Sequence, residues 1–210
     1  MATAFATSAW GANLLVNPGF ETGDLSGWTV SGLTGAGMSG DPIPGTLFGA
    51  TIAVKEGTFA AYGVVRGSCC TIPEPAIFSQ LISVTPGTDY TAGFFAKHQS
   101  LTGVGYSVGD AATSIQIFVD GVGLLPSSSH TSCPLDCFSS VRGFLAFEST
   151  FNSGAASSVL VEFRMIASGT GYAGISMDDF YVIGKVPEPA SIGMVIVALG
   201  AFAWKRGRRL

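Results

Sequence analysis

Residues 78–96, FSQLISVTPGTDYTAGFFA, carry the pattern that decides the fold. Apolar and polar residues alternate from Phe78 to Val84 and again from Tyr90 to Ala96, which is the period of a strand with one buried face. Between them, Pro86-Gly87 suits the two central positions of a type II turn, because proline presets the first φ and glycine accepts a positive second φ. The stretch therefore predicts an antiparallel hairpin.

Similar short runs continue toward the C-terminus, and no convincing amphipathic helix interrupts them. They comprise residues 114–119, which end in an Asp120-Gly121 turn, and residues 143–151, 158–166 and 174–183. Strands about 8–12 residues apart, separated by glycine-rich turns, are typical of a β-sandwich. We therefore expect an all-β, antiparallel sandwich domain over residues 13–185.

The composition fits this class and excludes others. Of 210 residues, 29 are glycine, and only 11% are charged, against roughly 25% in an average domain. Such low charge excludes a coiled coil and a charge-rich disordered tail. Residues 13–186 carry a net charge of −7 and residues 187–210 a net charge of +3. Because the acidic body would repel phosphate backbones, we expect no nucleic-acid partner.

The C-terminal segment has a different character. Residues 190–204, ASIGMVIVALGAFAW, are uncharged, and a basic cluster of Lys205, Arg206, Arg208 and Arg209 follows. The run would reach roughly 22 Å as a helix, short of the roughly 30 Å bilayer core, so a buried core helix is the alternative. Apolar residues on every face, with charge at one end only, favour a single transmembrane helix whose basic end is cytoplasmic.

Val186-Pro187-Glu188-Pro189-Ala190-Ser191, the apolar run and the basic cluster together resemble the PEP-CTERM sorting signal of Gram-negative bacteria. The resemblance covers residues 186–210. It implies export, transient anchoring in the inner membrane, and recognition and cleavage by an exosortase-type membrane transpeptidase. The expected destination is the cell surface or the exopolysaccharide matrix. Pro73-Glu74-Pro75 repeats the tripeptide without an apolar helix after it, and we interpret it as a loop.

Residues 1–12, MATAFATSAWGA, are small and apolar but lack a basic n-region and a full apolar stretch. We interpret them as the remnant of a signal peptide. A disordered N-terminus is the alternative interpretation.

Three parts of the body are similar, in order, to the opening strand, central hairpin and closing strand of galactose-binding-like and carbohydrate-binding-module jelly rolls: residues 13–28, 80–97 and 175–182. The resemblance implies a jelly roll with neighbouring first and last strands. It also implies a structural calcium held by Glu21 and by Asp178 or Asp179, and carboxylates are ligands that Ca²⁺ prefers. The alternative is that one aspartate faces solvent and the other caps a turn.

The cysteines occur as Cys69-Cys70 and as Cys133 and Cys137. In an exported protein four cysteines indicate disulfides, and adjacent cysteines bridge only with a strained ring. We therefore expect two cross-links between the 66–76 and 130–140 loops, with the pairing left open. A four-thiolate zinc site would need Cys-x-x-Cys pairs, which are absent from the sequence.

Catalysis has little support. His98 and His130 lie outside recognised hydrolase motifs, and Glu148 and Glu162 could act as a glycosidase pair only if the fold placed them roughly 5–10 Å apart. The candidate sugar-binding aromatic residues are Trp28, for which a core position is favoured, and Tyr62, Tyr106 and Tyr172, of which Tyr106 lies in a glycine-rich loop. We predict a non-enzymatic exported surface or matrix protein, with an exopolysaccharide-binding module as the alternative and an exported glycan hydrolase third.

Overall fold

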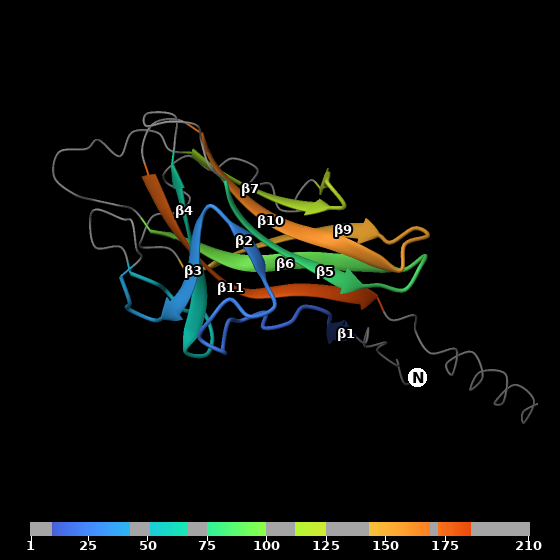
Figure 1. Cartoon of the computed structure of the whole chain (residues 1–210), viewed down its shortest axis with the longest axis horizontal. Helices are drawn as coiled ribbons and strands as arrows, with labels where there is room; N and C mark the ends of the chain where they lie inside the picture. Colours follow the sequence, from blue (N-terminus) through green and yellow to red (C-terminus); the bar gives the residue numbers. More distant parts are fainter. Residues whose placement is uncertain are drawn as a thin grey trace, which may run out of the picture.

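The computed structural model describes residues 10–42, 51–66, 75–99, 112–124, 143–168 and 172–185. In these segments the regular structure is entirely β, as the sequence predicts, and two antiparallel sheets pack face to face (Figure 1). The strands are β1 (Trp10–Asn13), β2 (Thr29–Ser31), β3 (Leu33–Met38), β4 (Phe59–Arg66), β5 (Ala76–Ser83), β6 (Asp89–Gln99), β7 (Ala112–Val119), β8 (Val122–Leu124), β9 (Leu145–Asn152), β10 (Ser158–Ser168) and β11 (Tyr172–Lys185).

One sheet, which we call sheet A, has the order β3-β4-β11-β6-β9, and β1 also pairs with β11. The other, sheet B, has the order β2-β5-β10-β7-β8. The first and last strands are therefore neighbours, as the jelly-roll resemblance implies. β1 begins at Trp10, before the domain start expected at Asn13.

The hairpin predicted for residues 78–96 is wrong. β5 pairs with β2 and β10 in sheet B, whereas β6 pairs with β11 and β9 in sheet A. The local turn has the expected form: Thr88 N donates to Thr85 O (3.3 Å), and Gly87 has a φ of 74°. The turn carries the chain from one sheet to the other instead of folding it back within one sheet.

A second crossing explains why the two strands do not pair with each other. The connection from β9 to β10 also passes from sheet A to sheet B, and it lies beside the first, with Gly87 N donating to Gly154 O (2.6 Å) and Val84 N to Ser157 O (2.9 Å). β5 therefore pairs with β10, and β6 with β9. Alternation shows which face of a strand is buried, but it does not show which strand is its partner.

The core lies between the two sheets and is largely aromatic. Phe180 of β11 lies at its centre, with ring centroids 4.9 Å from Phe94 and from Phe163, and 5.0 Å from Trp28. Such pairs contribute about 0.5–1.5 kcal/mol each beyond the burial of apolar area. Much of the phenylalanine content therefore serves to join the sheets.

Residues 186–210 lie outside the described residues, so the predicted transmembrane helix at 190–204 stays a prediction. In the part of the chain that the structure describes, no helix has the length and apolar character needed to cross a membrane.

Candidate functional site

β11 is irregular where it changes partner on one side. It pairs with β4 over Tyr172–Met177 and with β1 near Ile183, and its register with β6 shifts between Asp178 and Tyr181. Asp179 has a φ of 49°, which aspartate tolerates better than most residues. This bulge presents two consecutive carboxylates at a gap in the sheet.

The structure brings together the three acids that the jelly-roll resemblance assigned to calcium. A Cβ atom built on Gly19 would lie 3.6 Å from Asp178 Oδ1, 3.7 Å from Asp179 Oδ1 and 3.8 Å from Glu21 Cγ. Gly19 belongs to the segment between β1 and β2, whose backbone is tied to β11 by the bond from Phe180 N to Pro18 O (3.0 Å). We call Glu21, Asp178 and Asp179 the acidic cluster.

Two of these carboxylates, those of Asp178 and Glu21, bind the backbone of residues 51–58, which we call the cover loop. Asp178 Oδ2 accepts hydrogen bonds from Lys55 N (2.8 Å) and Glu56 N (3.2 Å), while its Oδ1 accepts from Asp179 N (2.8 Å). Glu21 accepts from Thr58 N (3.1 Å) and Phe59 N (3.2 Å). Each bond satisfies a polar backbone group that would otherwise need another partner. The acids therefore fasten the loop to sheet A.

Apolar contacts and a hydroxyl complete the attachment. Ile52 of the cover loop is buried against Ala60 and Val64 of β4, and Ser176 Oγ accepts from Ala53 N (2.9 Å). The cover loop thus lies on the outer face of sheet A.

A lysine supplies positive charge to this group. Lys55 Nζ lies 2.7 Å from Asp179 Oδ2, 3.1 Å from Glu56 Oε1 and 4.1 Å from the centre of the Phe95 ring. The hydrogen bond to Asp179 is the main cause that raises the pKa of Lys55. Burial raises the pKa of Asp178, and its backbone hydrogen bonds oppose that shift.

No three Asp, Glu, His or Cys side chains within the described segments are grouped as a metal site would require. The donor set is nevertheless of the right chemistry, since the acidic cluster contains carboxylates alone. Calcium binding by Glu21, Asp178 and Asp179 stays a prediction.

A second feature of the outer face of sheet A is Tyr181 on β11. Tyr181, Gly93 and Glu148 lie on one row across β11, β6 and β9. Because Gly93 has no side chain, the tyrosine ring lies across β6, where a Cβ would be 2.5 Å from the ring. Tyr181 Oη donates to Glu148 Oε2 (2.9 Å). Burial is the main cause that raises the pKa of Tyr181, and this hydrogen bond raises it further.

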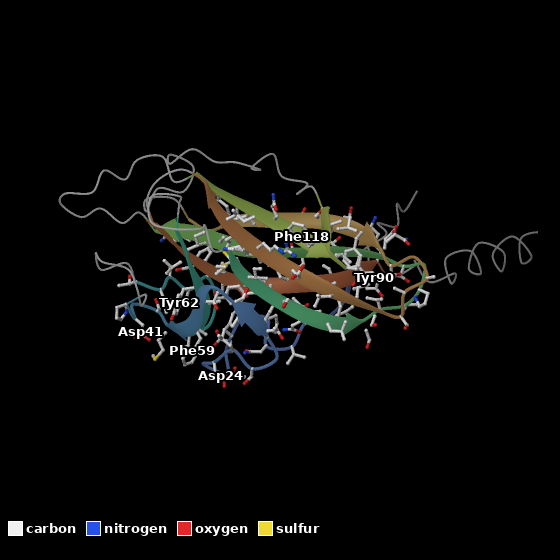
Figure 2. All side chains as sticks on the ribbon, turned by 45° about the horizontal axis from the view of Figure 1, so that its top comes forward. Asp24, Asp41, Phe59, Tyr62, Tyr90 and Phe118 are labelled. Carbon is white, nitrogen blue, oxygen red and sulfur yellow. The ribbon has the colours of Figure 1, made fainter. Side chains whose placement is uncertain are left out.

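Phe95 and Tyr62 are other aromatic residues of the described segments on this face, and they are partly exposed as Tyr181 is. Phe95 has the Lys55 ammonium over its ring. Tyr62 lies over Gly35 of β3 and packs with the cluster of Ile52, Ala60 and Val64; Figure 2 labels it at the β3–β4 end of the molecule, far from Tyr90. Tyr181 is a partly exposed aromatic side chain of this face that the sequence analysis missed, because nothing in its local sequence separates it from a core residue.

Trp28 is not available as a sugar platform. Its side chain is 8% exposed, its ring packs on Phe20 and Phe180, and its Nε1 donates to Asn17 O (3.0 Å). The core position that the sequence favoured is therefore the observed one. Tyr106 lies outside the described residues.

The outer face of sheet B carries a different set of groups. The Arg164 guanidinium lies 3.9 Å from the centre of the Phe118 ring and is paired with Glu162. Leu81 and Leu160, which are opposite each other on β5 and β10, are exposed. Phe118 is labelled in Figure 2.

Glu148 and Glu162 do not form a glycosidase pair. Each alternates with buried core residues, Glu148 on β9 of sheet A and Glu162 on β10 of sheet B, so they point outward on opposite sides of the sandwich. Packed sheets lie about 10 Å apart, and two outward side chains lie farther apart still, beyond the roughly 5–10 Å that glycosidase pairs need.

The remaining predicted site residues fall outside the described segments. They are the sorting motif Pro187, Glu188 and Pro189, the basic cluster, His130 and the four cysteines. Sequence reasoning also missed Lys55, since a single lysine in a Lys-Glu-Gly turn carries no spacing signal that links it to acids more than a hundred residues away.

Comparison with known protein families identifies the C-terminal segment. Residues 185–209 match the PEP-CTERM protein-sorting motif. No curated protein sequence matches the chain significantly.

Solved structures resemble the body in fold. The CBM22-1 xylan-binding domain of Paenibacillus barcinonensis Xyn10C is 13% identical, with a TM-score of 0.51 over 87% of this chain and 99% of that domain. The CBM22-1–CBM22-2 tandem domain of the same protein is 12% identical, with a TM-score of 0.50 over 88% of this chain and 49% of that chain. The chain thus carries a PEP-CTERM sorting motif directly after a β-sandwich whose structural neighbours include carbohydrate-binding modules with a jelly-roll fold.

Proposed function

We propose that this protein is an exported, non-enzymatic component of the cell surface or exopolysaccharide matrix, which an exosortase-type membrane transpeptidase sorts and processes. The observation that carries the proposal is the match of residues 185–209 to the PEP-CTERM motif. β11 ends at Lys185, so the motif begins where the last strand of the sandwich ends. Cleavage in the motif would therefore leave the strands of the body intact.

The chemistry of the motif suits recognition by a processing enzyme. Pro187 and Pro189 have fixed φ angles and no N–H group, and each disfavours a helical conformation in the residue before it. Pro-Glu-Pro therefore favours an extended strip with few local hydrogen bonds. The apolar residues 190–204 would hold the chain in the inner membrane while the basic cluster stays on the cytoplasmic side.

Replacement of Pro187, Glu188 and Pro189 by alanine tests the sorting proposal. We expect the variant to remain in the inner-membrane fraction in a host with an exosortase, whereas the wild type reaches the surface or the matrix. The matched control replaces the same tripeptide at Pro73, Glu74 and Pro75 and should be delivered normally. Normal delivery of the 187–189 variant would contradict the assignment.

Glycan binding is a second candidate function, favoured by Tyr181. Sugar rings stack on aromatic side chains that are held flat, and neighbouring polar groups fix their orientation. Tyr181 is held across Gly93, and Glu148 beside it supplies a carboxylate. The ligand would be a neutral polysaccharide, because the body has a net charge of −7 over residues 13–186.

Affinity electrophoresis in gels that contain the host exopolysaccharide, xylan or galactan tests this second function. Retardation of the wild type that is lost in Tyr181→Ala and kept in Phe118→Leu would support a site on sheet A. Phe118 is the matched control because it is an aromatic residue on the opposite face. If retardation is lost only in Tyr106→Ala, the binding site lies elsewhere. If the wild type is not retarded, only the structural function remains as the proposal.

The cysteines enter the proposal as two disulfides between the loops that contain Cys69-Cys70 and Cys133 with Cys137. Such links stabilise by restricting the unfolded chain. Peptide mapping of the exported protein without reduction should yield linked peptides from both loops. Four free thiols in that sample would refute the disulfides.

A further inference from the structure

We propose that the ammonium group of Lys55 is the resident cation of the acidic cluster, and that it holds the cover loop on sheet A in the structural role that the jelly-roll resemblance gives to calcium. Calcium remains the alternative cation, and the experiment below distinguishes the two.

The position of Lys55 supports the proposal first. Its ammonium is 2.7 Å from Asp179 Oδ2 and 4.1 Å from the centre of the Phe95 ring, and its side chain is only 24% exposed. A carboxylate and an aromatic face both attract a cation, and partial burial strengthens such attraction. Glu56 adds a third, more exposed contact at 3.1 Å. The Lys55 ammonium therefore lies where two carboxylates and an aromatic ring all attract a positive charge.

The bonds of the carboxylates support it second. Asp178 and Glu21 together accept hydrogen bonds from five backbone N–H groups, those of Lys55, Glu56, Thr58, Phe59 and Asp179. A calcium ion that took these oxygens as ligands would weaken or displace those bonds and leave backbone donors without partners. Three of these donors belong to the cover loop, so Asp178 Oδ2 and the Glu21 carboxylate already bind its backbone.

The main chain of Lys55 supports it third. The same residue donates its N–H to Asp178 and its ammonium to Asp179, so one residue of the cover loop binds both aspartates of the β11 bulge. The N–H groups of Lys55 and Glu56 also direct positive partial charge at Asp178. The charge and the dipoles that balance the acidic cluster therefore come from the loop that the cluster holds.

Thermal unfolding of the full chain tests the proposal, with calcium or with EGTA in excess. We expect the wild-type Tm to be the same in both, and the Tm of Lys55→Met to fall by about 2–6 °C. Lys97→Met is the matched control, because Lys97 lies on the same side of β6 as Phe95 but is not among the residues that bind the acidic cluster, and the Tm of this variant should fall little. Lys55→Arg should retain most of the wild-type Tm.

Two results would overturn the proposal. One is a wild-type Tm that falls in EGTA and recovers with calcium, together with calcium binding measured by calorimetry, since the cluster would then be a calcium site. The other is a Tm of Lys55→Met equal to that of Lys97→Met. If Lys55→Met does not fold, the wild-type calcium titration and the Lys55→Arg variant still decide between lysine and calcium.

Discussion

The outer faces of the two sheets differ in how their side chains are covered or exposed to water. Sheet A carries buried polar groups, with Asp178 and Ser176 both 0% exposed, and a loop bound over them. Sheet B leaves apolar side chains in solvent, with Leu81 72% exposed, and pairs Glu162 with Arg164 on its surface. Buried polar groups cost stability unless each has a partner. Substitutions on the outer face of sheet A should therefore lower the unfolding free energy far more than substitutions on the outer face of sheet B.

Removal of Asp178 should break this contrast most strongly. Asp178→Ala leaves three backbone N–H groups without their acceptor and should cost roughly 2–4 kcal/mol of unfolding free energy. Asp178→Asn keeps one carbonyl oxygen and the shape of the side chain, so its cost should be smaller. Glu162→Gln on sheet B is the matched control. Urea unfolding measures all three, and equal losses at Asp178 and Glu162 would remove the distinction between the faces.

Two glycines with nearly the same φ angle sharpen the contrast. Gly57 of the cover loop has a φ of 77°, and Gly87 of the Pro86-Gly87 turn has a φ of 74°. A Cβ on Gly57 would collide with the Glu21 carboxylate, whereas one on Gly87 meets no atom within 4 Å.

Gly87→Ala should therefore cost only the backbone strain, roughly 1–2 kcal/mol. Gly57→Ala should cost more, because Glu21 must also leave Thr58 N and Phe59 N. Paired urea unfolding curves give the difference. A Gly57→Ala variant that is no less stable than Gly87→Ala would show that Glu21 does not fasten the loop.

Tyr181 should make the unfolding free energy depend on pH in the alkaline range. Burial and the hydrogen bond to Glu148 raise its pKa above the ordinary value of 10.0. A tyrosine whose pKa is higher in the folded state stabilises the fold fully below its unfolded pKa, and this contribution is lost as the pH rises from there through the folded pKa.

Unfolding free energies measured from pH 8 upward should therefore fall above about pH 10, and less steeply in Tyr181→Phe. Burial raises the pKa of Tyr62 as well, so Tyr62→Phe should remove a further part of the fall. An identical slope in the wild type and in Tyr181→Phe would contradict the assignment.

The smallest effect should come from the exposed apolar residues of sheet B. Leu81→Ser should change the unfolding free energy by less than about 0.5 kcal/mol, because the side chain is mostly in solvent already. Ile82→Ser, one residue along the strand and 4% exposed, is the contrasting variant and should be severely destabilising. A large loss in Leu81→Ser would show that another part of the chain covers this face.

How much of this could be predicted differs between strands and site. The alternating runs predicted the strands at residues 112–119, 145–152, 158–168 and 172–185 within a few residues at each end, because each buries one face. The Asp120-Gly121 turn also has the positive φ values of 48° and 77° that this pair favours in a two-residue hairpin. These features depend on neighbours in the sequence alone.

The site was predictable only in part. Resemblance placed Glu21, Asp178 and Asp179 together, and the structure does so around Gly19. It could not reveal that the acids bind the cover loop, nor that Lys55 reaches them, because the residues lie far apart in the sequence. Tyr181 was missed for the same reason, since its ring packs across Gly93 on another strand.

By itself, the sequence determined β5, β6, β7, β9, β10 and β11, the Pro86-Gly87 turn, the acidic body and the C-terminal sorting motif, because each follows from local periodicity, backbone preference or composition. It did not predict β2, β3, β4 or β8, which lie outside the alternating runs. The tertiary structure alone decided that β5 and β6 belong to different sheets, that Glu148 and Glu162 face opposite ways, and that Lys55 joins the acidic cluster. The physical reason is that pairing depends on long-range contacts, and a period of two residues specifies a buried face without specifying what lies beside it.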